Sequence, residues 1–203
     1  MTLVKLCGLM SPADAAMVAD AGADMAGMVM SQGFRRSVTS EEAAIMARAV
    51  EGTAVPVGVF VDEPMDSIVM KVRKAGLGMV QLHGSEDASY IECLKGELGI
   101  PVVKSFRPDR AGRDEIESSP ADLVLLDPGA GTGTAFDWSS LAGIRRRFIL
   151  AGGLTPGNVA SAVSAMHPYA VDVSSGIETD GRKDKDKMKA FVAAVREQDS
   201  KEV

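Results

Sequence analysis

The chain has 203 residues, 46% of them hydrophobic, which suits one globular domain spanning residues 1–203. Its formal net charge of −6 disfavours a general nucleic-acid-binding surface. Two cysteines are too few for a disulfide framework, and there is no CxxC pair of the kind that binds zinc. With no signal-peptide pattern and no apolar stretch approaching about 20 residues, we expect a cytoplasmic protein without a membrane span.

Short apolar runs recur along the chain, each rich in Val, Ile, Leu or Met and followed by a helix-like segment. They lack polar alternation, which is typical of parallel strands that are buried on both faces. The predicted strands, in chain order, are Leu3–Cys7, Met25–Met30, Pro56–Val61, Met79–Leu82, Pro101–Ser105, Leu123–Asp127, Phe148–Ala151 and Ala170–Val173.

Helix-capping residues follow several of these runs. Ser11 precedes a proline, so its hydroxyl is placed to cap a helix whose first position needs no N–H group. Thr155 also precedes a proline, and we expect another helix to begin there. Gly22 is typical of a residue that ends a helix. Between the fifth and sixth strands only Arg113–Ser118 has helical character, which predicts a short fifth helix.

Eight strands alternating with helices predict an α/β fold, a small single-domain (β/α)8 TIM barrel with a reduced fifth helix. An open, doubly wound sheet is the main alternative, and the number of strands is what favours closure. A length of 203 residues lies near the lower limit for such a barrel, in agreement with the short fifth helix.

Polar and small residues follow the predicted strands at their carboxyl ends, where the active site of a TIM barrel lies. A barrel with a purely structural role needs no such groups there. The residues at these strand ends are Cys7, Ser31–Arg36, Gln81, His83, Asp127, Gly152, Gly153, Asp172 and Ser174–Gly176. We therefore expect a functional site at this end of the barrel.

Two glycine-containing turns follow the seventh and eighth strands. Gly152 and Gly153 lie in LAGGLTPGNV, and Ser174, Ser175 and Gly176 lie in VDVSSGIE. Glycine lets the backbone approach a ligand closely, so that several N–H groups point at one anion. Barrels often bind phosphate at these two positions, which predicts a small phosphorylated substrate. The alternative is that both segments are only tight turns.

Cys7 is either a small buried hydrophobic residue or a reactive thiol. Lys5 lies two residues earlier and so on the same face of the strand, where its ammonium is expected to lower the thiol pKa. Lys5 is itself expected to form a buried ion pair, with Asp172 as a candidate partner.

Three polar residues each allow a structural and a functional interpretation. Asp127 ends an apolar run, and either caps a helix or loop or forms an acid–base pair with Cys7. His83 either orients its loop or contacts the substrate. Arg36 is either a solvated loop charge or a substrate contact.

Three other features are expected to be structural. Cys93 is predicted to pack in the middle of a helix, and His167 to lie on the surface. The two histidines lie on opposite faces, which argues against a metal site. The run Gly181–Lys187 alternates in charge and is expected to form the exposed start of a helix.

Taken together, these motifs resemble the phosphoribosylanthranilate isomerase family, in order and over nearly the whole chain. The matching segments are VKLCGL at 4–9, GVFVDEP at 58–64, VQLHGSED at 80–87, LLD at 125–127, GTGTAFDW at 131–138, LAGGLTPGNV at 150–159 and VDVSSGIE with GRKD within 171–184. The Gly-Gly turn occurs in many phosphate-binding barrels, but the whole set is specific to this family.

The resemblance implies an isomerase of tryptophan biosynthesis, a branch of aromatic amino acid biosynthesis, that needs no cofactor and no metal. Its reaction converts N-(5-phosphoribosyl)anthranilate to 1-(2-carboxyphenylamino)-1-deoxyribulose 5-phosphate, an Amadori rearrangement of an aldose to a ketose. The alternatives are another phosphate-binding barrel enzyme and a non-catalytic sugar-phosphate-binding barrel. The sequence leaves the oligomeric state open between a monomer and a homodimer.

The resemblance also implies roles for single residues. The family's general base falls on Cys7 and its general acid on Asp127. Arg36 would contact the anthranilate, although the loop SQGFRRSV departs from the family pattern and leaves Arg35 as an alternative. The two glycine-containing turns would bind the phosphate. His83 and Asp172 would be substrate-binding residues at the mouth of the barrel.

Overall fold

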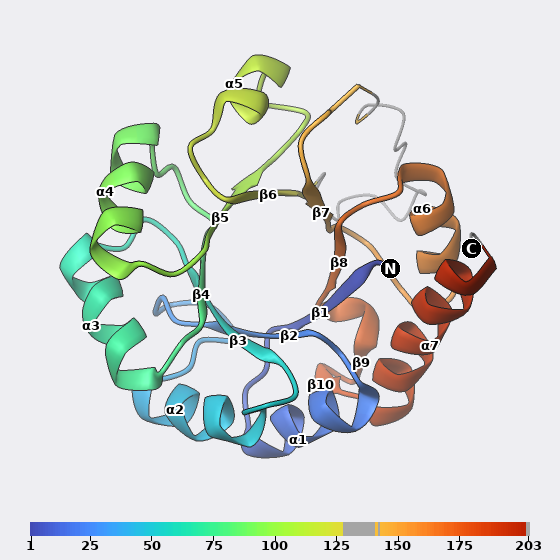
Figure 1. Ribbon diagram of the computed structural model, residues 1–203. Coiled ribbons are helices and arrows are strands. Elements are labelled where there is room, and N and C mark those ends of the chain that lie inside the picture. Colours follow the sequence, from blue (N-terminus) through green and yellow to red (C-terminus); the bar gives the residue numbers. More distant parts are fainter. Residues whose placement is uncertain (128–140, 142, 202–203) are drawn as a thin grey trace.

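Eight parallel strands close into a barrel, with β1 to β8 in sequence order around the ring (Figure 1). The computed structural model describes residues 1–127, 141 and 143–201. The strands are β1 Leu3–Cys7, β2 Met25–Val29, β3 Val55–Phe60, β4 Met79–Leu82, β5 Val102–Phe106, β6 Leu123–Leu126, β7 Phe148–Leu150 and β8 Ala170–Val173. The predicted TIM barrel is confirmed, each strand boundary lies within one residue of its predicted position, and the open sheet is excluded.

Helices surround the barrel on its outer side (Figure 1). They are α1 Pro12–Ala21, α2 Ser40–Ala49, α3 Met65–Ala75, α4 Ala88–Leu98, α5 Arg113–Ser118, α6 Val159–Met166 and α7 Lys185–Lys201. The short α5 occupies the predicted residues. After β8 the chain forms the 3-10 turn η2 (Ser175–Ile177) and a two-stranded hairpin of β9 (Glu178–Thr179) and β10 (Arg182–Lys183). No helix in the described ranges is long and apolar enough to cross a membrane.

The capping prediction is confirmed for α1 and wrong for α6. Ser11 and Asp14 form a reciprocal capping box at the start of α1, and Gly22 ends that helix with a φ of 72°. Helix α6 begins at Val159 instead of directly after Thr155. The reason is a local turn, because the Asn158 side chain accepts a hydrogen bond from the Thr155 N–H at 2.8 Å and donates one to the preceding loop.

Two apolar cores hold the barrel together. The larger one lies between the strands and the surrounding helices. The smaller one fills the barrel with Met25, Val57, Val103, Leu125, Ile149, Ala151 and Ala170. Beyond this smaller core the inward-facing side chains are polar, namely those of Lys5, Gln81 and Asp172. The interior therefore turns polar toward the carboxyl ends of the strands.

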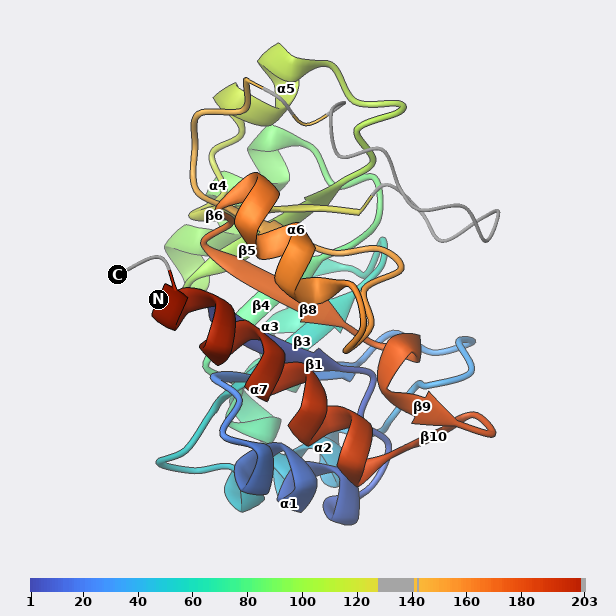
Figure 2. The ribbon, with the colours of Figure 1, turned by 90° about the vertical axis from the view of Figure 1, so that its right-hand side faces the viewer.

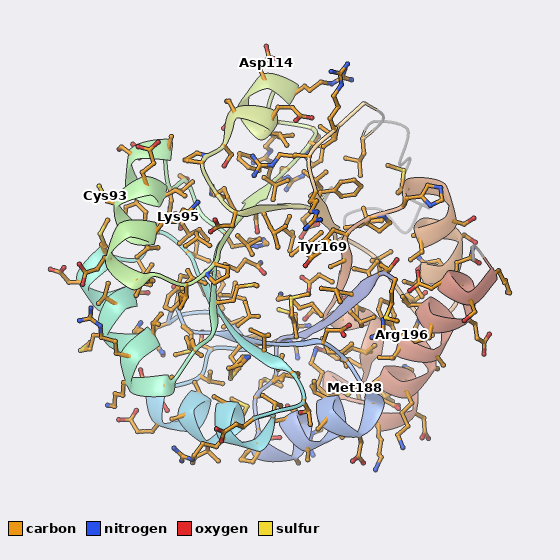
Figure 3. The ribbon with its side chains drawn as sticks, viewed as in Figure 1. Cys93, Lys95, Asp114, Tyr169, Met188 and Arg196 are labelled. Carbon is orange, nitrogen blue, oxygen red and sulfur yellow. The ribbon has the colours of Figure 1, made fainter. Side chains whose placement is uncertain are left out.

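The N-terminus and the end of α7 lie at the end of the barrel away from this polar region (Figure 2). Figure 2 shows the N-terminus and the end of α7 on one side and the β9–β10 hairpin on the other. Asp199 accepts hydrogen bonds from the backbone and hydroxyl of Thr2, and Arg196, which Figure 3 labels on α7, donates to the Thr2 carbonyl at 2.6 Å. These contacts fasten α7 beside the start of β1.

Candidate active site

A buried charge pair forms the floor of the site. The Lys5 ammonium on β1 donates to the Asp172 carboxylate on β8 at 3.0 Å, and Lys5 is only 1% exposed. The two residues are register partners across the seam where β8 meets β1. Burial lowers the pKa of Lys5, but attraction by Asp172 and Cys7 outweighs burial and leaves that pKa raised. The ion pair expected from the sequence is therefore present, and it places a fixed ammonium inside the barrel.

Cys7 lies at the end of β1, on the same strand face as Lys5, and is 8% exposed. Burial raises the pKa of its thiol, while the Lys5 ammonium lowers it in part. The sequence-based expectation of a lowered thiol pKa is therefore wrong, because the loss of solvation outweighs the single nearby cation. The thiol carries its proton at neutral pH in the absence of a substrate.

The backbone of β2 leaves a space for this sulfur. Gly27 is the register partner of Cys7, and a Cβ at Gly27 would lie 2.7 Å from the Cys7 sulfur. Any side chain at this position would therefore displace the thiol. Sequence reasoning missed Gly27, because only the pairing of β1 with β2 brings the two residues together.

His83 and Asp127 follow β4 and β6. The Gln81 amide nitrogen lies 3.0 Å from His83 Nδ1 and also donates to the Ser105 hydroxyl at 3.3 Å. With the amide as donor, Nδ1 accepts, and a neutral imidazole carries its proton on Nε2. Burial lowers the pKa of His83, and the negative charge of the nearby Asp127 raises it. The effect of burial is larger, so the pKa is lowered. His83 is therefore a neutral hydrogen-bonding group close to Asp127.

Arg36 approaches the first strand from the loop after β2. A Cβ at Gly8, directly after Cys7, would lie 2.5 Å from Arg36 Cδ and 2.8 Å from the Ser174 hydroxyl. Gly8 has a φ of 74°, a left-handed backbone conformation that favours glycine. The absence of a side chain at Gly8 also lets Arg36 and Ser174 approach its backbone closely. The Arg36 side chain is 23% exposed and that of Arg35 is 55% exposed. Arg36 is thus the arginine that lies beside Cys7 and the β8 turn.

A cluster of charges that sequence reasoning missed holds this arginine. Glu178 on β9 accepts hydrogen bonds from Arg36, Arg35 and Lys183. The Lys183 side chain is fully buried, so the expectation of an exposed, solvated charge run is wrong at this position. A signal for the hairpin was present, since Asp-Gly at 180–181 is typical of a tight turn between two strands.

The two glycine-containing turns lie against each other. Gly152 and Gly153 both have positive φ values, 86° and 65°. A Cβ at Gly176 would overlap the carbonyl oxygen of Leu154, so only glycine allows the β8 turn to contact the β7 turn. Lys183 donates to the carbonyl oxygen of Ser174 at 2.9 Å and fixes the start of the β8 turn. The two segments thus form one continuous surface at the carboxyl ends of β7 and β8.

Three further expectations have different outcomes. His167 is exposed, as predicted, but Cys93 is exposed on the outer side of α4, so its predicted packing role is wrong (Figure 3). The resembling segment at 131–138 lies outside the described residues. The part of the chain that the structure describes contains no group of three His, Cys, Asp or Glu side chains arranged to hold a metal ion.

The arrangement brings a thiol, a carboxyl group, a neutral imidazole, a guanidinium and two glycine-containing turns to one end of a barrel. A thiol and a carboxyl group, Cys7 and Asp127, follow the first and sixth strands and so approach a ligand from different parts of the ring. Ligands with a phosphate and a second negative charge fit the cations and backbone N–H groups around them.

Comparisons with known proteins agree with this chemistry. Residues 4–194 match the family model described as N-(5'phosphoribosyl)anthranilate (PRA) isomerase. An N-(5'-phosphoribosyl)anthranilate isomerase from Desulforudis audaxviator (strain MP104C) is 40% identical over 207 residues, covering 97% of this chain and 99% of the relative.

Solved structures give the same result. The crystal structure of phosphoribosyl anthranilate isomerase from Thermus thermophilus superposes with a TM-score of 0.86 at 35% identity, covering 97% of this chain and 99% of that one. A phosphoribosyl anthranilate isomerase in complex with reduced 1-(o-carboxyphenylamino)-1-deoxyribulose 5-phosphate has a TM-score of 0.86 at 32% identity, covering 97% and 100%. Sequence, fold and site lead to one conclusion: the chain belongs to the N-(5'-phosphoribosyl)anthranilate isomerase family.

Proposed function

We propose that this chain converts N-(5'-phosphoribosyl)anthranilate to 1-(2-carboxyphenylamino)-1-deoxyribulose 5-phosphate, an Amadori rearrangement in tryptophan biosynthesis. The observation that carries this proposal is the family match over residues 4–194 on a closed barrel. The position of Cys7 beside the buried Lys5, at the same end of the barrel as the glycine turns, supports the mechanism proposed below.

The substrate phosphate is assigned to the two glycine turns. Gly152 and Gly153 after β7 and Ser174, Ser175 and Gly176 after β8 offer backbone N–H groups close together. An anchored phosphate fixes the sugar between the acid and the base and converts binding energy into orientation. Arg36 is assigned to the carboxylate of the anthranilate ring, because it is the better-buried arginine at the mouth.

Asp127 is assigned the first proton transfer. In the complex it donates a proton taken up from solvent on substrate binding to the ring oxygen of the aminofuranose, the C1–O bond breaks, and the nitrogen lone pair forms an iminium at C1. His83, held neutral and close to Asp127, is assigned a substrate hydrogen bond from its Nε2 proton.

Cys7 is assigned the second proton transfer. The thiol loses its proton to solvent as the complex forms, and the resulting thiolate removes the C2 proton, which the iminium acidifies. The C–H electrons form an enolamine that neutralises the nitrogen. Tautomerisation of the enolamine to the C2 ketone completes the reaction. The Lys5 ammonium stabilises the thiolate, and Asp172 holds that ammonium in place.

Replacing the acid and the base tests this proposal. Cys7→Ser and Asp127→Asn are each expected to lower kcat by about 10²- to 10⁴-fold, because each removes one general acid–base step. The loss of substrate fluorescence measures turnover, and Cys93→Ser serves as the matched control, since Cys93 is exposed on α4. Full activity in either active-site variant contradicts the role assigned to that residue.

The same assay separates the alternatives. A non-catalytic sugar-phosphate-binding barrel would bind the substrate and give no turnover even as the unaltered chain. Another phosphate-binding barrel enzyme would be inactive on this substrate. The cytoplasmic location and the choice between a monomer and a homodimer stay predictions, which cell fractionation and analytical ultracentrifugation test.

A further inference from the structure

Glu178 is the centre of a charge cluster that the mechanism above does not use. Its carboxylate pairs with both arginines of the loop after β2 and with Lys183 of β10. The Glu178 side chain is 7% exposed and the Lys183 side chain is 0% exposed. A buried carboxylate needs such partners, but three cations for one carboxylate exceed what neutralisation requires. The four groups together keep a net positive charge.

The contact between Glu178 and Arg36 is directional. Arg36 Nε donates to one carboxylate oxygen at 2.7 Å and Nη2 donates to the other at 3.0 Å, which is a two-point pairing of planar groups. This pairing fixes the plane of the guanidinium. Within the described part of the chain, Nη1 of Arg36 has no hydrogen-bond partner. Its N–H groups are therefore available to an anionic ligand.

Lys183 connects the same carboxylate to the phosphate side of the site. Its ammonium donates to Glu178 at 3.0 Å and to the Ser174 carbonyl at 2.9 Å. Gly8 packs against both Arg36 and the Ser174 side chain, so the backbone next to Cys7 lies between the two anchored groups. One carboxylate thereby determines the spacing between the arginine and the β8 turn.

We propose that Glu178 is a positioning residue for the isomerase reaction, which orients Arg36 toward the anthranilate carboxylate relative to the phosphate-binding turn. The inference rests on the proposed function, since it gives Arg36 that substrate contact. Burial raises the pKa of Glu178, but hydrogen bonds from Arg36, Lys183 and Arg35 outweigh it and lower the pKa to about 2. Glu178 is therefore a permanent anion at working pH and takes no part in proton transfer.

The first test is a double-mutant cycle between Glu178→Gln and Arg36→Met. In the unaltered background, Glu178→Gln is expected to raise KM by about 10- to 150-fold, the range for a lost hydrogen bond to a charged group, with a smaller change in kcat. In the Arg36→Met background most of this effect is expected to disappear, because the group that Glu178 positions is gone.

A matched control distinguishes positioning from the general loss of a buried ion pair. Glu86 pairs with Lys104 at 2.9 Å, and both side chains are nearly fully buried. Glu86→Gln is expected to lower the free energy of unfolding. Its effect on KM is expected to be the same in the unaltered and the Arg36→Met backgrounds. Glu178→Asp keeps the charge and serves as the second variant if Glu178→Gln does not fold. Equal KM effects of the Glu178 substitution in both backgrounds overturn the proposal.

A binding measurement keeps this test separate from the proposed function. Anthranilate carries the carboxylate of the substrate without its phosphate, and inorganic phosphate carries the phosphate without the carboxylate. Calorimetric titration measures the binding of each compound without turnover. The Glu178 substitution is expected to weaken anthranilate binding more than phosphate binding. Equal weakening of both overturns the positioning role, whereas an inactive unaltered chain that binds both ligands contradicts only the proposed function.

Discussion

At the scale of single residues, Cys7 illustrates how burial and one nearby charge compete. The Lys5 ammonium favours the thiolate, but the desolvation of an 8%-exposed side chain disfavours it more. A thiol that stays protonated until the substrate arrives is less exposed to oxidation than a free thiolate, because the thiolate is the reactive form.

The thiol pKa is directly measurable. In a Cys93→Ser background, the ultraviolet absorbance of the Cys7 thiolate is expected to appear only above the ordinary thiol pKa of about 8.5, since burial raises the Cys7 pKa. Lys5→Met is expected to move the midpoint higher still, because it removes the opposing cation. The Cys7→Ser, Cys93→Ser protein provides the baseline. A midpoint at or below that of a free thiol would contradict the prediction.

Gly27 gives a second prediction at this scale. Gly27→Ala places a Cβ 2.7 Å from the Cys7 sulfur, so the thiol must move, and a displacement of about 1 Å can reduce kcat about 10²-fold. Gly96→Ala on the exposed face of α4 is the control, where an added Cβ meets no atom within 4 Å. That change is expected to stabilise the fold by about 0.5–1 kcal/mol and to leave kcat unaltered. Equal kcat values for both variants would exclude a steric role for Gly27.

At the scale of elements, the turns that follow the strands carry most of the candidate site residues. The backbones of the β7 and β8 turns are in contact, because residue 176 is a glycine. The contact makes one continuous surface out of two short turns, and this is the surface to which the substrate phosphate is assigned.

Separating these turns is expected to weaken substrate binding. Gly176→Ala would force the β8 turn away from the Leu154 carbonyl, and the loss of one charge-assisted hydrogen bond corresponds to a KM about 10- to 150-fold higher. Gly157→Ala is the control within the same region, because its added Cβ meets only an ordinary contact at 3.8 Å. Steady-state kinetics of both variants check this prediction. It is wrong if the two substitutions change KM equally.

The elements themselves were largely predictable from the sequence. Strand boundaries agree within one residue because apolar runs such as Leu3–Cys7 are buried on both faces. The start of α6 was predicted wrongly because the Asn158 side chain stabilises a turn that competes with the helix. Lys183 was predicted to be exposed because its run alternates in charge, and a local charge pattern does not show that Glu178 on the neighbouring strand β9 pairs with it.

At the scale of the whole molecule, the hairpin after β8 connects the two sides of the barrel seam. Arg36 comes from the loop after β2 and Glu178 from the hairpin after β8, 142 residues later, with β1 between them. Their ion pair therefore spans the closure of the ring.

This closure is expected to be sensitive to acid. The folded-state pKa of Glu178 is lowered from 4.5 to about 2, so its stabilising contribution is fully present above about pH 5 and is lost as the pH falls toward 2. The contribution amounts to at most about 3 kcal/mol. Urea unfolding as a function of pH is expected to show a flatter profile in this window for Glu178→Gln. Glu41→Gln alters an exposed pair with Lys74 and is expected to leave the pH profile unchanged. If both variants change the pH dependence of the free energy of unfolding equally, the prediction is wrong.

The sequence by itself determined the strands, the barrel and the type of residue at each strand end, because burial pattern and turn chemistry are local properties of the chain. It also indicated that Cys7 and Asp127 lie at one end, since the carboxyl ends of parallel strands share a side. Only the tertiary structure decided that Gly27 accommodates the sulfur, that burial outweighs Lys5 in the thiol pKa, and that Glu178 holds Arg36. These properties depend on neighbours contributed by other strands, whose distances and solvation exist only once the barrel has closed.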